Sequence, residues 1–235
     1  MQLFYNPNLE KDTKTFTFDT FESKHIIRVL RKKVGDNLQI TNGKGLFLFA
    51  IITEDNPKAC SIEIVRVKKI HPTKHRLHMV VAPTKMNDRY EWFLEKATEI
   101  GVHEITPILC DRSERKSIKI ERFEKVVQSA MKQSFQAYLP KINPLTSLQS
   151  FLENNQQGLL FIAHCAETER QELKRKLAAD QPITILIGPE GDFNSNEIKL
   201  AKGKGYMPIS MGKTRLRTET AAIVACTTVA LTNNG

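Results

Sequence analysis

The feature that most constrains the fold is an apolar run at residues 183–187, broken only by Thr184 and followed at once by Gly-Pro-Glu-Gly at residues 188–191. A short apolar run bounded by a turn is typical of a strand buried on both faces of a parallel sheet. Ligands of such sheets bind beyond the carboxyl ends of the strands, so residues 188–191 are a candidate binding loop. Gly-Pro-Glu-Gly is neither a dinucleotide fingerprint nor a Walker loop, and alone it is also compatible with a plain turn.

Strands and helices alternate from residue 77 onward. Periodicity predicts strands at 77–82, 104–109, 159–163, 183–187 and 207–210. The same criterion predicts helices at 90–100, at 122–135, from 195 to 203 or 205, and from about 219 to 231. Asn194 and Glu197 resemble a capping box before the third of these helices. This alternation predicts an α/β fold with a parallel sheet.

The first seventy residues differ from the rest, because turn-forming residues separate short β-branched or aromatic segments at 39–41, 46–53 and 61–67. This pattern predicts a small β-barrel. The polar segment 67–75 contains Pro72 and is interpreted as a linker. We therefore expect one domain at residues 1–72 and a second at 73–235.

A basic helix is expected at residues 22–33 within the first domain. Its apolar residues form one stripe that we expect to be buried, namely Ile26, Ile27, Val29 and Leu30. Its cations are expected in solvent, as on an ordinary amphipathic helix or on an RNA-binding surface.

Composition narrows the functional classes. No stretch approaches the roughly 18 apolar residues of a membrane span, and the N-terminus lacks the features of a secretory signal, so we expect a cytoplasmic protein. The four cysteines have no metal-ligand spacing and are interpreted as reduced core residues, and no metal is expected. A net charge of +9 favours a nucleic-acid partner.

A second glycine turn, Met211 and Gly212, follows the strand at 207–210 and leads into residues 213–221. This turn and the loop at 188–191 are expected to converge on one pocket. Thr218 and Thr220 are expected to cap the final helix. Arg217 and Glu219 are either functional or a plain structural ion pair.

Several motifs together resemble one known family. They are residues 187–191, 211–212 and 216–221, with Arg28-Val-Leu-Arg31, Gly35-Asp36, residues 96–102, Arg112-Ser113, Gln133-Ser134 and Pro140. In this order they resemble the SPOUT methyltransferases, and within them the 16S rRNA uridine-N3 methyltransferase family. Two positions depart from the family pattern: Asp192 replaces a second glycine, and Gln136 stands where a basic residue is common.

The resemblance implies a PUA-like β-barrel followed by a SPOUT α/β domain whose parallel sheet is knotted as a trefoil. It further implies S-adenosylmethionine (SAM) as the methyl donor, a cytoplasmic homodimer, and methylation at N3 of a uridine in the decoding region of the small ribosomal subunit. The partner would be 16S rRNA, within the assembled subunit. The alternatives are a methyltransferase for another RNA position and a non-catalytic RNA-binding factor in ribosome assembly.

The resemblance also assigns candidate site residues. The cofactor would lie against Leu186, Ile187, Gly188, Pro189, Glu190, Gly191, Met211, Gly212, Leu216, Thr218, Thr220 and Ala221. Arg217 would orient the uracil, and Glu219 or Glu190 would accept its proton. RNA would bind the cations Lys24, Arg28, Arg31, Lys32, Arg112, Arg115 and Lys116.

Overall fold

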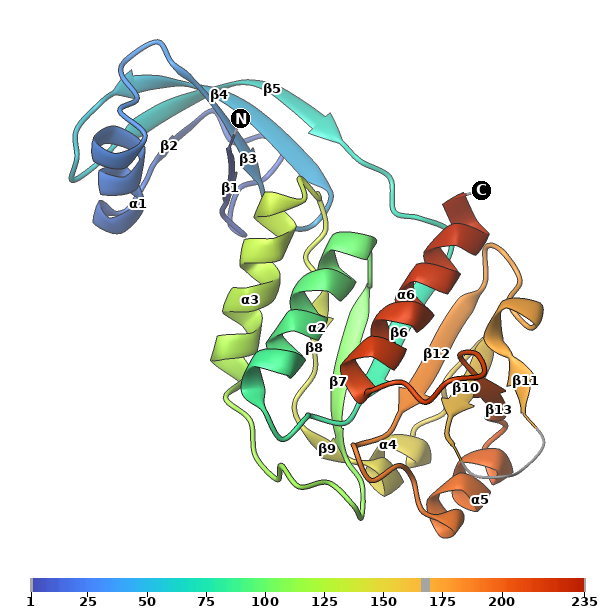
Figure 1. Cartoon of the computed structure of the whole chain (residues 1–235). Coiled ribbons are helices and arrows are strands. Elements are labelled where there is room, and N and C mark those ends of the chain that lie inside the picture. The colour runs from blue at the N-terminus through green and yellow to red at the C-terminus, as the bar shows by residue number, and fades with distance from the viewer. Residues whose placement is uncertain (1, 166–169, 235) are drawn as a thin grey trace. The chain divides into compact units, whose positions relative to one another are not determined.

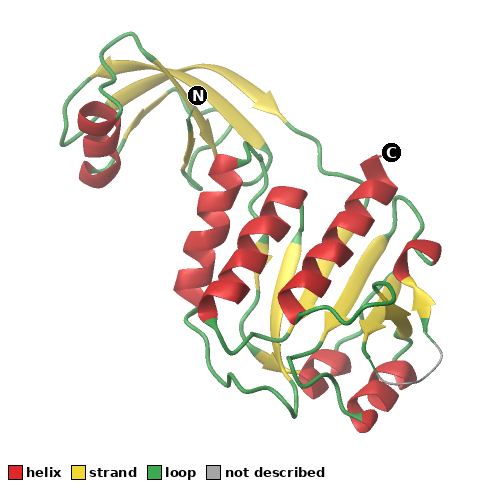
Figure 2. Ribbon diagram, viewed as in Figure 1, coloured by secondary structure: helices red, strands yellow, loops and turns green. Residues whose placement is uncertain are grey.

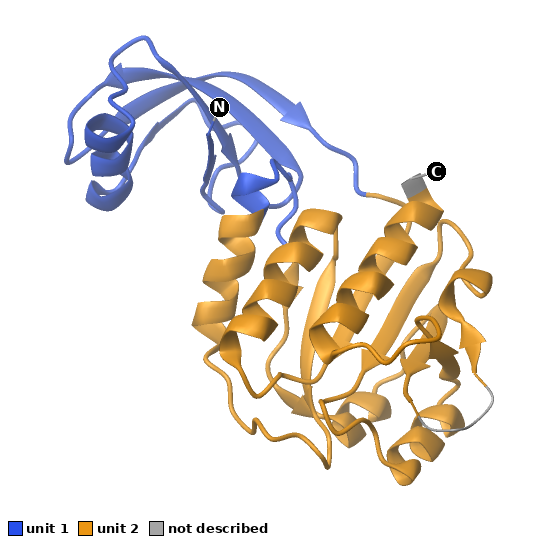
Figure 3. Cartoon of the chain, viewed as in Figure 1, with its two compact units in different colours: residues 1–72, 131–139 blue, residues 73–130, 140–235 orange. Residues whose placement is uncertain are grey.

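The computed structural model describes residues 2–165 and 170–234, which divide into two units (Figure 3). The first comprises Met1–Pro72 and Met131–Leu139, and the second comprises Thr73–Ala130 and Pro140–Gly235. Residues 131–139, which we had expected in the second domain, count with the first because their backbone bonds to it. Gly45 N donates to Ala137 O at 2.9 Å, and Leu139 N donates to Gly43 O at 2.9 Å.

The first unit is built on a five-stranded sheet in the order β1 (Leu3–Tyr5), β3 (Asn37–Thr41), β4 (Leu46–Glu54), β5 (Ser61–Lys69) and β2 (Thr15–Thr17) (Figure 1). Its core contains alternate residues of the long strands, including Leu48, Ala50 and Ile52 of β4. Strand β5 extends two residues beyond its predicted end at residue 67, into the predicted linker, because Lys68 and Lys69 still pair with Phe47 and Leu46 of β4.

The predicted basic helix at 22–33 is shorter and partly irregular. Helix α1 (Thr20–Lys24) begins at the N-cap Asp19 and continues into a π-helical turn, η1 (His25–Val29). The wider turn rotates Val29 out of the expected apolar stripe, and its side chain is 68% exposed, whereas Ile26 is fully buried. The expectation that Val29 is buried was therefore wrong.

The second unit contains an all-parallel sheet. Its order is β11 (Gln171–Glu172), β13 (Met207–Ser210), β10 (Leu159–Ala163), β12 (Pro182–Ile187), β6 (Arg76–Val81), β7 (Glu104–Leu109) and β8 (Lys141–Ile142), and β9 (Thr146–Ser147) also pairs with β7. All the pairings are parallel, so the predicted α/β fold with a parallel sheet is confirmed. The predicted trefoil knot concerns the threading of the chain and stays a prediction.

Helices cover both faces of this sheet (Figure 2). On one face, α2 (Asn87–Ile100) packs against α6 (Thr218–Asn234), which also contacts β6 and β12. On the other, α4 (Leu148–Glu153) and α5 (Ser195–Gly203) pack with Val80, Ile162 and Leu186 in one cluster. Helix α3 (Ile120–Gln133) and the 3₁₀ turn η2 (Leu173–Arg175) complete the elements. The predicted capping box of α5 is present, since Asn194 and Glu197 bond reciprocally.

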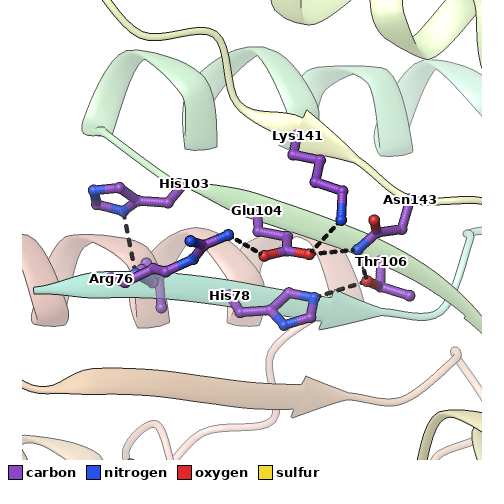
Figure 4. A network of polar contacts seen from close by, with 8 residues as sticks. Arg76, His78, His103, Glu104, Thr106, Lys141 and Asn143 are labelled. Atoms are coloured by element: carbon purple, nitrogen blue, oxygen red, sulfur yellow. Dashed lines mark hydrogen bonds and ion pairs between the residues drawn. The ribbon is translucent and has the colours of Figure 1, made fainter. Parts of the chain in front are cut away.

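A polar network joins β6, β7 and β8 at their amino ends (Figure 4). Glu104 accepts from Arg76 at 2.6 Å and from the Asn143 side chain at 2.8 Å, and its carboxylate lies 3.3 Å from the Lys141 ammonium. Asn143 also reaches Thr106, whose hydroxyl lies 2.7 Å from the His78 ring. Although burial raises the pKa of Glu104, the hydrogen bonds from Asn143 and Arg76 and the nearby cations lower it to about 2.

Replacing Glu104 by glutamine tests this network. A carboxylate with a lowered pKa stabilises the fold above its unfolded pKa, and the stabilisation is lost as the pH falls towards 2. We expect E104Q to lower the free energy of unfolding by about 1–2 kcal/mol at pH 7. Urea unfolding at several pH values should show the gap to the wild type closing below about pH 4. The exposed Glu153 is a matched control, and a pH-independent gap for E104Q would contradict the prediction.

Candidate functional site

Three neighbouring strands of the second unit end at the same level. Strand β10 lies between β12 and β13, and Ala163 at its end is in register with Ile187 of β12 and Ile209 of β13. Because all three strands are parallel, the turns that follow them are brought together at one edge of the sheet.

These turns and the start of α6 line a cavity of about 300 Å³, here called the strand-end cavity. Most of the residues predicted to bind a cofactor or to act in catalysis line it: Ile187, Gly188, Pro189, Glu190, Met211, Gly212, Leu216, Arg217, Thr218, Glu219 and Ala221. Three predicted residues do not. Leu186 points into the core below α4 and α5, Gly191 lies beside Arg112, and Thr220 faces a neighbouring groove.

Other lining residues were not predicted. They are Arg89, Ala163, His164, Cys165, Arg170, Asp192, Ile209, Ser210, Thr214 and Arg215. Three of the missed polar residues, His164, Cys165 and Arg170, follow β10, where the sequence carries no glycine motif. For His164 and Cys165 the only signal is position, since they come directly after a buried strand.

His164 is the least expected member of this wall. Its side chain is 4% exposed, and neither ring nitrogen has a hydrogen-bond partner within the described part of the chain. Burial lowers the pKa of His164, against the opposing charge of Asp192, so the ring is neutral at pH 7. A neutral imidazole carries one donor and one acceptor, and both are buried here.

Asp192 preserves the backbone shape that a glycine would give the loop. Its φ is 62°, in the left-handed region that glycine adopts readily, and its N donates to Pro189 O at 2.9 Å. Its carboxylate adds two bonds that glycine cannot make, accepting from Cys165 N at 2.8 Å and Phe193 N at 2.8 Å. The departure at this position therefore ties the turn after β12 to the turn after β10.

Close packing leaves little room for a side chain at the glycines of the loop. A Cβ atom on Gly188 would lie 3.1 Å from the Phe193 ring, and one on Gly191 would lie 3.0 Å from the Arg112 side chain. Thr218 donates its hydroxyl to Gly188 O at 3.1 Å. Thr218 thus holds the loop to the start of α6, and the prediction that Thr220 caps this helix is wrong, because α6 already begins at Thr218.

The charged residues of the cavity have distinct surroundings. Glu190 accepts at Oε1 from Lys85 N at 2.9 Å, while its buried Oε2 has no partner among the described residues. The nearly buried Glu219 lies 4.0 Å from the Arg89 guanidinium. Because Glu219 pairs with Arg89, the alternative of a plain structural ion pair between Arg217 and Glu219 is wrong. The exposed Arg217 lines the cavity.

The predicted RNA-binding cations occupy both units. In the first, Lys24, Arg28 and Arg31 are exposed and Lys32 is partly exposed. In the second, Arg112 donates to Gly191 O at 2.9 Å and Arg115 donates to Ser117 O at 3.0 Å, while Lys116 is exposed. Arg112 therefore supports the glycine loop in addition to its predicted role.

Two further expectations concern cysteines and metals. Cys60, Cys110 and Cys226 are buried as expected, but Cys165 is exposed because it follows β10 at the rim of the cavity. In residues 2–165 and 170–234, no three His, Cys, Asp or Glu side chains gather as metal ligands. No helix in these ranges has the length and apolar character to span a bilayer.

The cavity suits a small molecule with an apolar ring and several polar groups. Its apolar walls include Ala163, Ile187, Ile209 and Leu216, and its lining also includes His164 and Glu190, each of which carries a buried polar atom without a partner among the described residues. A positively charged ligand would also lie near two carboxylates, those of Glu190 and Glu219.

Known proteins support a methyltransferase assignment. The chain matches the RNA methyltransferase domain over residues 71–230 and the RNA methyltransferase PUA domain over residues 19–65. It is 31% identical to "Ribosomal RNA small subunit methyltransferase E" of Rickettsia conorii, over 98% of this chain and 95% of that protein.

Solved structures agree in fold. A crystal structure from Porphyromonas gingivalis, described as a "probable rRNA-methyltransferase", is 37% identical with a TM-score of 0.92, covering 100% of this chain and 99% of that chain. A Legionella pneumophila methyltransferase in complex with SAM is 26% identical with a TM-score of 0.87, covering 98% and 97%. From these matches and the cavity geometry, the chain belongs to the RNA methyltransferase family, with an N-terminal PUA domain.

Proposed function

We propose that this protein transfers a methyl group from SAM to N3 of a uridine in 16S rRNA, in the decoding region of the small ribosomal subunit. The observation that carries the proposal is the strand-end cavity, in which three parallel strands bring two glycine turns and Arg217 together. The matched relatives are named as small-subunit rRNA methyltransferases, and one matched structure holds SAM.

The cofactor is proposed to lie in the strand-end cavity. SAM supplies a methyl group that its sulfonium already makes electrophilic. Backbone groups of residues 187–190, 211–212 and 216 would hold its adenosine and methionine parts, with the apolar wall against the adenine. His164 would complete this set, because its two ring nitrogens are buried and unpartnered within the described residues.

The chemistry required of the protein is limited. Uracil N3 carries a proton and becomes nucleophilic when that proton leaves and the negative charge on O2 and O4 is stabilised. Arg217 would orient the uracil and stabilise its anion. Glu219 or Glu190 would accept the proton, since both carboxylates line the cavity.

The substrate would be held by both units and presented in an unpaired state, because N3 is hydrogen-bonded in a duplex. The exposed cations Lys24, Arg28 and Arg31 of the first unit and Lys116 of the second would contact phosphates. The proposal includes a cytoplasmic homodimer with a trefoil knot, acting on the assembled small subunit, as the family resemblance implies.

Mapping of methylated nucleotides tests the proposed function directly. We expect rRNA from cells lacking this protein to lose one N3-methyluridine, which the purified protein and SAM restore on isolated small subunits. Mass spectrometry of nuclease fragments identifies the position, and naked 16S rRNA is compared as substrate. An unchanged uridine pattern, or a methyl group on another nucleotide, would contradict the proposal.

Replacing Arg217 by alanine separates chemistry from cofactor binding. Loss of a donor that stabilises the developing anion should slow single-turnover methylation by about 100-fold. SAM affinity, measured by calorimetry, should change by less than about 3-fold, as expected for a role confined to the transition state. Unchanged turnover would remove Arg217 from the mechanism.

Replacing Asp192 by glycine tests the link between two cofactor turns. Glycine keeps the backbone shape at φ 62°, while the hydrogen bonds to Cys165 N and Phe193 N are lost. We expect SAM to bind about 10-fold more weakly, as one or two lost hydrogen bonds predict. Asp180, at φ 60° and outside the cavity, provides the matched variant D180G. Equal SAM affinity in D192G and the wild type would disprove the link.

A further inference from the structure

A second hollow of about 760 Å³ adjoins the strand-end cavity and is here called the outer groove. It lies between the start of α2, the segment before α6 and the start of α6. Five residues line both spaces: Arg89, Arg215, Leu216, Arg217 and Glu219. A molecule in the outer groove would therefore share a wall with a cofactor in the cavity.

Trp92 gives this groove an aromatic surface. It is the only tryptophan of the chain, and its side chain is 44% exposed on α2. The helix packs through Tyr90, Phe93, Leu94 and Ala97, which are buried, so Trp92 lies off the stripe that holds the fold together. An exposed indole beside a hollow offers a flat face on which a nucleic-acid base can stack.

The charges of the groove suit a nucleotide. Arg89, Arg215 and Arg217 face the carboxylates of Asp88 and Glu219, which leaves an excess of one positive charge. No ion pair or side-chain hydrogen bond within the described ranges engages the guanidinium groups of Arg215 and Arg217. Guanidinium donors match phosphate oxygens and the carbonyl oxygens of uracil.

We infer that the outer groove is the subsite for the extruded target nucleotide, an unpaired pyrimidine of RNA whose ring stacks on Trp92. Arg215 contacts its phosphate, and the shared wall of Arg217 and Glu219 presents its N3 edge to the strand-end cavity. This inference rests on the proposed methylation of rRNA and adds the residues that receive the base. A second copy of this chain is the competing occupant of the groove.

Because Trp92 is the single tryptophan, its fluorescence reports whether the outer groove is occupied. We expect a short oligouridylate to quench the fluorescence of the full-length protein saturably, at a concentration that does not depend on protein concentration. The variant Trp92→Phe, which keeps an aromatic face, should bind a dye-labelled oligouridylate within about 3-fold of the wild type. Trp92→Leu should bind about 10-fold more weakly, the order expected for the loss of one stacked base.

Methylation assays give a second readout. On small ribosomal subunits, Trp92→Leu should raise KM by about 10-fold and leave SAM affinity, measured by calorimetry, unchanged. The variant Leu200→Ala, which alters an exposed apolar side chain of α5 outside the groove, serves as the matched control. Thermal unfolding of each variant confirms that it is folded.

Three results would overturn the inference. The first is the absence of quenching at every soluble oligouridylate concentration. The second is fluorescence that follows protein concentration alone, which would assign the groove to a second copy. The third is Trp92→Leu with wild-type KM on subunits that the protein methylates, which rejects the subsite while the proposed function stands. Failure of the wild type to methylate any rRNA would instead reject the proposed function.

Discussion

The parallel pairing of β10 with β12 and β13 is the constraint on which the site depends. Backbone hydrogen bonds fix Ala163 in register with Ile187 on one side and Ile209 on the other. Parallel strands place their carboxyl ends at one edge, so the segments that follow Ala163, Ile187 and Ile209 become neighbouring turns although they are separate in sequence. A shift of register in either pair would separate the turns and open the cavity.

Bonds from side chains then hold the turns in place. The loop after β12 is tied to α6 by Thr218, to the segment after β7 by Arg112, and to the turn after β10 by Asp192. Each tie comes from a different part of the chain. The loop is thus fixed by surrounding structure and can keep its shape without a ligand, which lowers the ordering cost of binding.

Much of this organisation could be predicted from the sequence, because the start and type of each element depend on residues that are close in sequence. The run at 183–187 predicted a buried strand, and the capping pair Asn194 and Glu197 predicted where α5 begins. The order of the strands is not local, and so nothing in the sequence indicated that β10 lies between β12 and β13. For that reason His164 and Arg170 were missed, although both follow a predicted strand or its turn. The error at Val29 has another origin, since a π-helical turn breaks the period of 3.6 residues on which the prediction relied.

The carbonyl groups around the cavity also indicate how a ligand is recognised. Gly188 O accepts from Thr218, Pro189 O from Asp192 N, Gly191 O from Arg112, and His164 O from Arg170. Because each already accepts a hydrogen bond from the protein, these carbonyls mainly serve to fix the loops. Among the lining residues, the buried polar side-chain atoms that the fold leaves unpartnered are the ring nitrogens of His164 and Oε2 of Glu190, within the described part of the chain. The acids of the second unit differ in their surroundings, since the ionised Glu104 lies between Arg76 and Lys141 at the amino ends of the strands, whereas Glu190 and Glu219 line the cavity at the other end.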